Sequence, residues 1–331
     1  IMDSHSWHLW DYTDENGDER QRIKRVISID GEESLYVYHN ERSADIDYVQ
    51  QGEDTRLCYE QFVNESGTED QRVTYSVTYN YQDNNWVRTN YIYVGDSATL
   101  ERTRQYQYDP ETEETSSLLV ETIFEEYTDE DGSAQRRVRR VIAFNPDQNA
   151  WNVTDYSYTS DNSDLISHTN QYVYDRSSGE YGDLFNESTY EEFNEEITNE
   201  WGFVVHERVS SRIAFSIRFS FADENWMKTF YEYEDGSEYV TQTYSVNYDY
   251  SSETEGQFIS ETYYEAYYDM RGNRDQRIDY TVSYDGAEYN YAEFNYAADN
   301  NTDEVDYVDT YLYDYDTAQI GTLLSHTEYE S

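Results

Sequence analysis

Alternation of apolar and polar residues is the dominant pattern along this chain. In the segment 72–81 the odd positions carry Val or Tyr, and the even positions carry Arg, Thr, Ser or Asn. The same period of two recurs at 231–233, 243–250, 279–284 and 290–296. Because successive side chains of a strand point to opposite faces, the pattern predicts strands with one aromatic and one polar face. No helical period is found, and the nearest candidate, 118–126, favours a strand.

Turn residues interrupt the alternation at short intervals. They are Asn16-Gly17, Asp30-Gly31, Ser66-Gly67, Asp131-Gly132, Asp235-Gly236, Gly272-Asn273 and Asp285-Gly286. Asn-Gly and Asp-Gly readily take the positive φ values that tight hairpins need. Short loops of this kind join neighbouring antiparallel strands and leave no room for crossovers. The chain is therefore predicted to be an all-β meander.

A five-fold repeat underlies this pattern. The pair Arg-Val or Arg-Ile recurs at Arg22, Arg72, Arg137, Arg212 and Arg277, at intervals of 50, 65, 75 and 65 residues. An aromatic-acidic phrase such as Tyr59-Glu60-Gln61-Phe62 precedes each pair by about ten residues. Repetition of this kind predicts an array of similar units, each of four antiparallel strands. The third unit shows them best, at 118–127, 135–144, 151–159 and 165–175.

The repeat divides the chain into units and a remainder. The predicted boundaries are 1–53 for a short first unit, 54–117, 118–183, 184–256 with an insertion at 194–206 around Trp201, and 257–321. The remainder, 322–331, resembles the first strand of a sixth unit. We expect an open array of stacked or adjoining meander sheets. The alternative is a closed five-bladed β-propeller, which accounts for five units but not for the surplus strand.

Composition supports a folded but unusually acidic protein. The chain has 71 acidic and 22 basic residues, for a formal charge of −49, and it has 39 tyrosines. Low aliphatic content with high charge is typical of disorder, but disordered chains are poor in aromatic residues. Buried tyrosines can instead supply the core. The charge excludes binding of nucleic acid by a basic surface, and no apolar stretch predicts membrane insertion.

The residues that carry chemistry do not form catalytic motifs. The six histidines are scattered over different units, and no nucleophile elbow, phosphate-binding loop or zinc-ligand spacing is present. Cys58 is the single cysteine, so the chain has no intrachain disulfide framework. Carboxylate pairs are too abundant to indicate a glycosidase. We therefore expect no enzyme activity and no organic cofactor.

Calcium is the candidate cofactor. Asp14, Asn16 and Asp18, and likewise Asp129 and Asp131, place alternate oxygen ligands in loops that contain glycine. Hard cations prefer such oxygen clusters. Hairpin turns use the same residue types for backbone reasons, however, and both interpretations remain open here.

Carbohydrate and glycosylation are the remaining candidates. Trp86, Trp151 and Trp226 each open a strand after a polar turn, and Tyr289 takes this place in the fifth unit. Exposed aromatic rings can stack on sugars, although recurrence in register is equally typical of a repeated core position. Asparagine-linked glycosylation sequons begin at Asn64, Asn152, Asn186 and Asn300 and are compatible with export.

Several phrases resemble a known class of surface proteins. They are Tyr106-Gln107-Tyr108-Asp109, Tyr172-Val173-Tyr174-Asp175, Tyr248-Asp249-Tyr250, Tyr311-Leu312-Tyr313-Asp314 and Tyr268-Asp269-Met270-Arg271-Gly272-Asn273. With the turn-Trp strand starts, they are similar to tandem β-repeat proteins of bacterial cell surfaces, the YD-repeat group and repeat proteins exported by Bacteroidota. The resemblance implies surface exposure and repeat-based assembly. The usual Gly-Asn-Leu-Thr continuation is absent, and the unit is longer than a typical YD repeat.

These patterns together predict an extracellular or cell-surface structural protein. We expect a filament or fibre subunit that binds copies of itself by β-strand addition. The surplus strand, with Leu323, Leu324, His326 and Tyr329, is the expected donor. The alternative is a carbohydrate-binding adhesin module that uses the Trp and Tyr faces.

Overall fold

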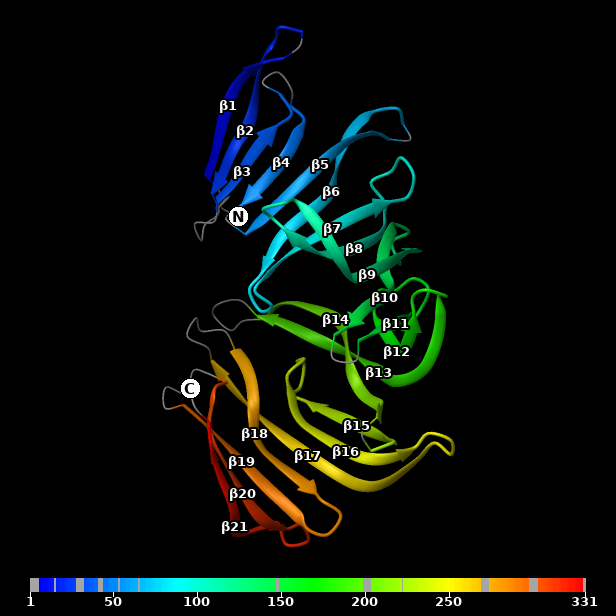
Figure 1. The fold of residues 1–331 in the computed structure, drawn as a ribbon, viewed down its shortest axis with the longest axis vertical. Coiled ribbons are helices and arrows are strands. Elements are labelled where there is room, and N and C mark those ends of the chain that lie inside the picture. Colours follow the sequence, from blue (N-terminus) through cyan, green and yellow to red (C-terminus); the bar gives the residue numbers. More distant parts are fainter. Residues whose placement is uncertain are drawn as a thin grey trace. The chain divides into compact units, whose positions relative to one another are not determined.

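The computed structural model is entirely β. It describes residues 6–14, 16–27, 33–40, 44–52, 54–64, 66–146, 149–198, 204–221, 223–268, 274–297 and 303–329. These residues form 21 strands in one open antiparallel sheet (Figure 1). Pairing runs between consecutive strands from β1–β2 to β10–β11 and from β13–β14 to β20–β21.

The strands fall into five groups of four and one further strand. Group one holds β1 (Ser6–Thr13), β2 (Glu19–Ile27), β3 (Glu33–Tyr38) and β4 (Ile46–Gln51). Group two holds β5 (Thr55–Val63), β6 (Glu69–Asn80), β7 (Asn85–Tyr93) and β8 (Leu100–Asp109). Group three holds β9 (Glu114–Thr128), β10 (Ala134–Asn145), β11 (Ala150–Tyr158) and β12 (Ile166–Asp175). Group four holds β13 (Glu180–Thr198), β14 (Val204–Ser220), β15 (Asn225–Tyr233) and β16 (Val240–Asp249). Group five holds β17 (Thr254–Tyr268), β18 (Arg274–Tyr284), β19 (Tyr289–Tyr296) and β20 (Val305–Asp314), and β21 (Gln319–Glu328) follows.

The predicted fold class is confirmed. The sheet is open, so the alternative of a closed propeller is wrong. The four strands expected in the third unit correspond to β9–β12 with ends shifted by a few residues. β13 and β14 pair from Asn194↔Val209 to Thr198↔Val204, and the unit boundaries with an insertion at 194–206 stay a prediction. Trp201 lies outside the described residues.

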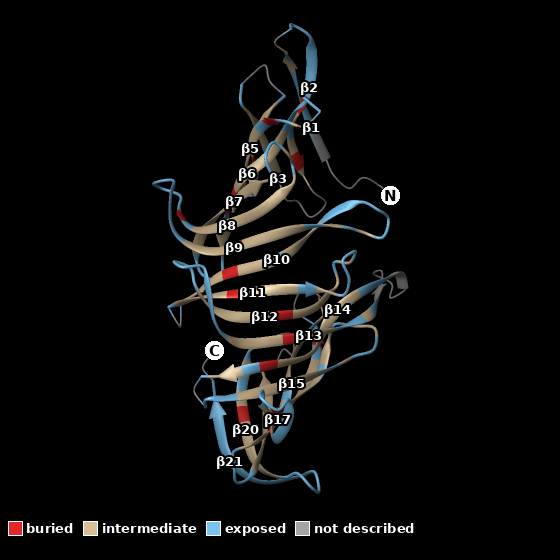
Figure 2. Cartoon of the chain, turned by 90° about the vertical axis from the view of Figure 1, so that its right-hand side faces the viewer, coloured by how far each residue is buried: buried red, intermediate tan, exposed pale blue. Residues whose placement is uncertain are grey.

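The chain divides into two compact units. One comprises Ile1–Asp155 with Tyr174–Tyr181, and the other Tyr156–Val173 with Gly182–Ser331. Within each unit the core is thin and consists mainly of single β-branched residues near the middle of strands. Figure 2 shows these buried positions as short bands between half-buried stretches. They include Val26, Val49, Val77, Ile142 and Val153 in the first unit, and Ile217, Val246, Val282 and Val308 in the second.

The first hairpin of every group carries the same irregularity. The second strand has one extra residue opposite a step of the first, at His8/Leu9, Cys58/Tyr59, Ile123/Phe124, Thr189/Tyr190 and Tyr263/Tyr264. A bulge bends a strand and increases its twist. The recurrent arginine precedes the extra residue by two positions and lies directly opposite an acidic residue in groups two to five, as in Glu60↔Arg72. In group one the opposite residue is Trp10.

The recurrent arginine anchors a cluster in each group. In group two, Arg72 Nε donates to Glu60 Oε1 at 2.7 Å, and its guanidinium lies 4.8 Å from the Phe62 ring and 4.6 Å from the Tyr93 ring. Its Nη1 donates to the carbonyls of Gly95 and Ser97 in the β7–β8 loop. The planar fork of arginine allows ion pairing, stacking and carbonyl binding at once. We call this arrangement the arginine cluster.

The arginine clusters repeat with the same parts. Arg137, Arg212 and Arg277 donate Nε to Glu125, Glu191 and Glu265 at 2.7, 2.8 and 2.7 Å. A tyrosine from the third strand closes the cluster and donates its hydroxyl to a carbonyl beside the arginine. These bonds are Tyr38 to Ile23, Tyr93 to Val73, Tyr233 to Ile213 and Tyr296 to Ile278. The cluster therefore ties the first hairpin to the third strand.

Two glutamines next to the arginine link successive groups. Gln71 accepts from the Ile46 amide at 3.0 Å and donates to the Ile46 carbonyl at 2.9 Å. Gln276 makes the same pair of bonds to Val240 at 2.9 and 2.6 Å. Ile46 and Val240 are the first residues of β4 and β16. A side-chain amide thus takes the place of a ladder partner where the fourth strand begins.

The turn after every fourth strand of groups two to five is capped by an aspartate. The Asp249 carboxylate accepts from the amides of Ser251 and Ser252 at 2.9 and 3.3 Å, and from the Ser251 hydroxyl at 2.7 Å. Asp175 and Asp314 accept two turn amides each, and Asp109 accepts one. The fourth residue after each aspartate has a positive φ: Glu113, Gly179, Glu253 and Ala318. The Tyr-Asp phrase is therefore a turn signal.

Asp249 gives a testable pH dependence. Hydrogen bonds from the hydroxyls and amides of Ser251 and Ser252 lower the pKa of Asp249 to about 2. Since the folded pKa lies below the ordinary value of 3.8, this cap stabilises the turn fully above about pH 4 and is lost as the pH falls through about 2. We expect Asp249→Ala to accelerate amide exchange at Ser251 and Ser252 near pH 6. Equal acceleration at the Asp175 turn would contradict a local effect.

Candidate functional site

The last strand is a nearly uncharged open edge. Among the described residues β21 pairs only with β20, and each of its ten residues is exposed. Its large apolar side chains are about half accessible: Ile320 52%, Leu323 50%, Leu324 54% and the adjoining Tyr329 53%. The only acidic residue in the strand is Glu328. Sheet edges are normally protected by charge, proline or a covering segment, because unpaired backbone recruits other strands.

The repeat shows what covers the same positions elsewhere. Counted from Gly256 and Gly321, which approach the preceding strand alike, Leu323 occupies the repeat position of Phe258. Phe258 lies 5.8 Å from the ring of Tyr289 on β19 and 5.2 Å from the ring of Tyr315 in the β20–β21 turn. Phe258 is half-buried, whereas Leu323 is exposed. Leu323 therefore sits at a position that an interior strand would have covered.

His326 lies near the C-terminal end of β21. Its Nδ1 lies 2.6 Å from Asp309 Oδ1 on β20, and its Nε2 lies 3.4 Å from Glu328 Oε1. Hydrogen bonding to Asp309, followed by that to Glu328, raises the pKa of His326 above its ordinary value. Since the folded pKa is raised, protonation strengthens the β20–β21 contact below about pH 6.5, and the contribution is lost as the pH rises through the folded pKa.

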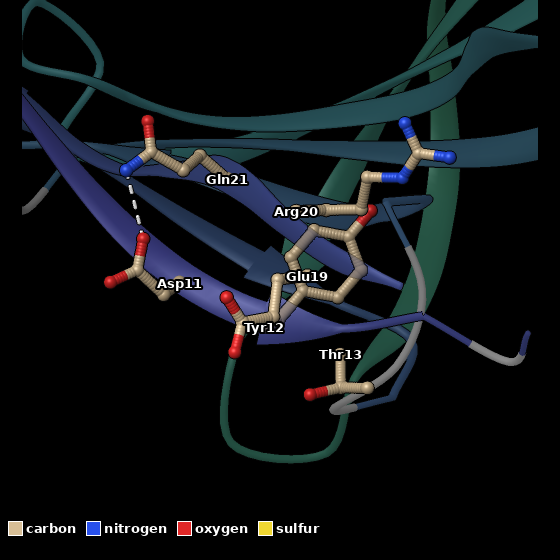
Figure 3. A pocket seen from close by; sticks show the side chains of 6 residues that line it. All are labelled: Asp11, Tyr12, Thr13, Glu19, Arg20 and Gln21. Carbon is tan, nitrogen blue, oxygen red and sulfur yellow. Dashed lines mark hydrogen bonds between the residues drawn. The ribbon is translucent and has the colours of Figure 1, made fainter. Parts of the chain in front are cut away.

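The first hairpin borders an open cavity. It has a volume of about 640 Å³ and is lined by Asp11, Tyr12, Thr13, Glu19, Arg20 and Gln21 (Figure 3). Gln21 precedes Arg22 as Gln71 precedes Arg72, but it donates to Asp11 at 2.8 Å within its own hairpin. The linking glutamine of group one is therefore engaged inside the hairpin. The cavity is open and its lining is mostly polar.

Each of the three recurrent tryptophans contacts its own aromatic or cationic neighbour. Trp226 stacks on Tyr250 at 4.5 Å with an interplanar angle of 24°, and the Arg176 guanidinium lies 4.7 Å from the Trp151 ring. Trp86 contacts Tyr79 at 5.2 Å. Each tryptophan is half-buried. Tyr250 and Arg176 directly follow the capping aspartates, so one ring face of Trp226 and Trp151 is already occupied by the chain. Glycan stacking at these residues stays a prediction.

The equivalent position in group five opens onto an aromatic cavity. A cavity of about 470 Å³ is lined by Glu288, Tyr289, Leu312, Tyr313, Asp314, Tyr315, Asp316, Gln319, Ile320 and Gly321. Tyr289 stacks on Tyr315 at 4.8 Å with an angle of 20°. Tyrosine rings beside carboxylates and an amide suit a small polyhydroxylated ligand. Of the aromatic positions named here, this is the one that combines stacked rings with a cavity.

The candidate calcium loops are hairpin turns with engaged carboxylates. Asp14 Oδ1 accepts from the amides of Asn16 and Asp18, both at 2.9 Å, and Asp129 Oδ1 accepts from the Ser133 amide at 2.7 Å. The turn bond to Asp18 is the main reason that the pKa of Asp14 is lowered. No group of three or more metal-ligating side chains occurs in the described part of the chain. Calcium binding by Asp14, Asn16, Asp18, Asp129 and Asp131 stays a prediction.

The glycosylation candidates differ in setting. Asn64 accepts the amides of Ser66 and Thr68 at 3.1 and 3.0 Å and so caps its own turn. Asn152 and Asn186 lie within β11 and β13 and are half-buried. Asn300 lies outside the described residues. Their modification stays a prediction.

Sequence reasoning used the recurrent arginine as a repeat marker and missed its role in the arginine cluster. It also missed the linking glutamines. The signal that was available is the pair Gln-Arg at Gln21-Arg22, Gln71-Arg72 and Gln276-Arg277. Neither role follows from the pair alone, because the partners of Arg72 and Gln71 lie on a loop and a strand about 25 residues away.

Comparison with known proteins gives only weak structural matches. No family model and no curated protein matches the chain. It is similar to the crystal structure of TcdB2-TccC3-Cdc42, at 14% identity over 92% of this chain, with a TM-score of 0.23. It is also similar to a Photorhabdus luminescens Tc holotoxin pore, at 8% identity over 97% of this chain, with a TM-score of 0.21. The matches span 16% and 18% of those chains, and at these TM-scores they carry no argument about this chain.

The β-repeat architecture therefore rests on the strands described above, and membership of the YD-repeat or exported Bacteroidota groups stays a prediction. Among the described residues there is no helix with the length and apolar character of a membrane span.

Proposed function

We propose that this chain is a non-enzymatic structural subunit of an extracellular filament or surface fibre, assembled by β-strand addition at β21. The observation that carries the proposal is the open edge itself. A strand with four half-exposed apolar side chains at or beside it and one acidic residue stands in a chain whose net charge is −49. Such an edge is costly to leave in water and offers backbone groups to another strand.

The repeated clusters support a structural role. Each group contributes its own arginine cluster and turn caps, so stability is built locally and extended by neighbours, as in other repeat proteins. The charge of −49 keeps separate chains apart at low ionic strength. Assembly is therefore expected when salt or divalent cations screen that charge, and calcium in this role acts diffusely over the acidic surface.

A second candidate function is carbohydrate binding. The cavity of about 470 Å³ beside Tyr289, Tyr313 and Tyr315 favours it, because stacked rings next to carboxylates and Gln319 fit a sugar ring and its hydroxyls. In this alternative the chain is a surface adhesin module, and its open edge plays no part in binding.

Removal of residues 322–331 separates the two functions. At about 1 M NaCl the Debye length falls to about 3 Å, so repulsion between chains is screened. We expect the complete chain to form elongated assemblies under negative stain and the shortened chain to remain monomeric. Monomers from both chains, together with retained binding to a glycan array, would favour the adhesin instead.

A single-residue pair sharpens this test. Leu324→Lys places a charge on the edge, whereas Val94→Lys places the same charge on a residue of similar exposure in the β7–β8 loop; the wild-type side chains are 54% and 47% exposed. Loss of assembly only in Leu324→Lys is the expected result. Equal loss in both variants would point to a general charge effect and would contradict the assigned edge.

A further inference from the structure

Two arginines of group two lie on either side of a buried valine. Arg56 of β5 is directly opposite Val77 of β6, and Val77 is directly opposite Arg88 of β7. Directly opposed residues of an antiparallel sheet point to the same face, and neighbouring strands lie about 4.7–4.9 Å apart. Val77 is 4% exposed, and the two arginines are half-buried. Both charges therefore lie on one face, with an apolar residue between them.

Tyr75 lies close to both charges. The Arg88 guanidinium is 3.8 Å from the centre of the Tyr75 ring, and Arg88 Nε donates to Asn90 Oδ1 at 2.9 Å. Hydrogen bonding to Cys58, followed by burial, raises the pKa of Tyr75 to about 12. The nearby charges of Arg88 and Arg56 act in the opposite direction. The Tyr75 hydroxyl therefore stays protonated at neutral pH and stands beside two cations.

Groups three to five carry a carboxylate at the place that Arg56 has in group two. This place lies in the first strand, shortly before the bulge and opposite a buried Val or Ile, and it holds Glu121, Glu187 and Glu261. Each glutamate accepts a hydrogen bond, at 3.0, 2.9 and 3.2 Å, from Arg104, Tyr250 and Gln242 respectively. Arg56 instead faces the uncharged Gln50 of β4. Group two therefore has a positive charge where three other groups have a negative one.

Arg88 also lacks the acidic partner of its repeat equivalent. Arg88 and Lys228 each lie two residues after a recurrent tryptophan. Lys228 Nζ donates to Oε1 of Glu255, the second residue of β17, at 2.9 Å. The second residue of β9, which follows group two, is Thr115. Since threonine has no charge, the carboxylate that pairs with Lys228 has no counterpart beside Arg88.

Arg56 and Arg88 have no carboxylate partner in the described part of the chain. Arg56 lies 5.8 Å from the Tyr48 ring, and Arg88 has the contacts to Tyr75 and Asn90 given above. Like charges that lie close together repel, and an anion between them offsets this repulsion. We infer that Arg56 and Arg88 bind the carboxylate group of an organic acid.

A carboxylate is the anion that the repeat favours. Beside an equivalent residue the chain supplies its own carboxylate, as Glu255 does for Lys228. Guanidinium groups match the planar carboxylate, and charge-assisted hydrogen bonds are about twice as strong as neutral ones. In the site each arginine donates to one carboxylate oxygen, and the Tyr75 hydroxyl supplies a further donor. The site shares no residue with β21 or with the aromatic cavity of group five, so it goes beyond both candidate functions.

Acetate and acetamide test the inference, because they have nearly the same shape and differ in charge. At an ionic strength held at about 0.15 M, acetate replaces chloride while NMR follows the Nε–H signals of the arginines. We expect saturable shifts at Arg56 and Arg88 with acetate and none with acetamide. Arg56→Gln should weaken acetate binding at Arg88 by about tenfold. Arg20→Gln removes the same charge from a side chain that is 56% exposed and should leave acetate binding unchanged.

Thr115→Glu tests the site without removing either arginine. It supplies from within the chain the carboxylate that Lys228 has from Glu255, so the acetate shift at Arg88 should be lost. Unchanged acetate binding in Thr115→Glu would overturn the inference. Acetate shifts at Arg56 and Arg88 no larger than at Arg20, or saturable shifts with sulfate but not with acetate, would overturn it as well. Binding is measured on separate chains, so its failure leaves assembly at β21 and the test of that assembly unaffected.

Discussion

Arg72→Met is expected to destabilise group two by about 2–4 kcal/mol, because it removes the centre of an arginine cluster. The Arg72 side chain is 15% exposed, pairs with Glu60 at 2.7 Å and fills the space between the Phe62 and Tyr93 rings. Methionine preserves much of the volume but leaves the carboxylate and the loop carbonyls of Gly95 and Ser97 without their donor. The largest part of the loss is the cost of those unpaired groups.

Native-state hydrogen exchange is the suitable measurement, since a repeat array does not unfold in one step. Protection against exchange should fall in β5, β6 and β7 and in the β7–β8 loop, and persist in group five.

Arg72→Lys should recover part of the lost stability, because a lysine keeps the charge but cannot stack on the rings and bind two carbonyls as the guanidinium does. Arg20→Met, at a side chain that is 56% exposed, should change stability by less than about 0.5 kcal/mol. Similar losses for Arg20 and Arg72 would contradict the role of the cluster.

The strands could be predicted because their signals are local. Alternation at 72–81 and the glycines of the hairpin turns depend only on neighbouring residues, and β6 and its neighbours follow them closely. The open form of the sheet followed from one count: five units of four strands leave β21 over. The four strands of group three were placed within a few residues for the same reason.

The arginine clusters could not be predicted because most of their partners are distant in sequence. Glu60 faces Arg72 because the hairpin turn pairs Val63 with Glu69 and this register holds as far as Tyr59↔Val73. The loop that supplies the Ser97 carbonyl, however, lies 25 residues away in sequence. Nothing local indicates that contact, so the recurrence of the arginine was visible while its role in the cluster was not.

The candidate sites also differ in whether local sequence or distant contacts determine them. Leu323, Leu324, His326 and Tyr329 were singled out by counting strands, and the structure places them on or beside one exposed strand. The tryptophans were singled out by recurrence, which does not reveal their neighbours. Trp226 is covered by Tyr250, the residue after a capping aspartate, and this contact spans 24 residues between β15 and the β16–β17 turn.

At one repeat position, residues in the same register differ in charge and in their charged neighbours. Glu121, Glu187, Glu261 and His326 occupy equivalent places in first strands, five residues after Ser116, Gly182, Gly256 and Gly321. Glu121 has three arginines around it, whereas burial raises the pKa of Glu261, which is held by Gln242. At the open edge the same repeat position is held by His326, which lies between the carboxylates of Asp309 and Glu328. The repeat fixes where the side chain points, and the neighbours decide which charge it carries.

Glu121→Gln is therefore expected to lower the stability of group three, where Glu121 lies in β9, by about 2–3 kcal/mol. The Glu121 side chain is 8% exposed and accepts from Arg104 at 3.0 Å and Arg102 at 3.2 Å, with Arg176 at 3.7 Å. Glutamine keeps the shape but removes the negative charge that faces three guanidinium groups, of which Arg102 keeps its pair with Glu101. The arginines retain access to water, which limits the cost to the lower part of the range for buried pairs.

The same substitution at Glu261 is the matched control, because its sign should reverse. Since burial raises the folded pKa of Glu261 above 4.5, its ionised form opposes folding at neutral pH, and Glu261→Gln removes that opposition.

Urea unfolding followed by hydrogen exchange at pH 7 should show protection lost around β9 in Glu121→Gln and held or gained around β17 in Glu261→Gln. On acidification from pH 7 to pH 4 the advantage of Glu261→Gln should shrink, because the wild-type carboxyl becomes neutral as the pH falls through its raised pKa. Losses of equal size at both positions would mean that the repeat position, and not the arginines around Glu121, determines the effect.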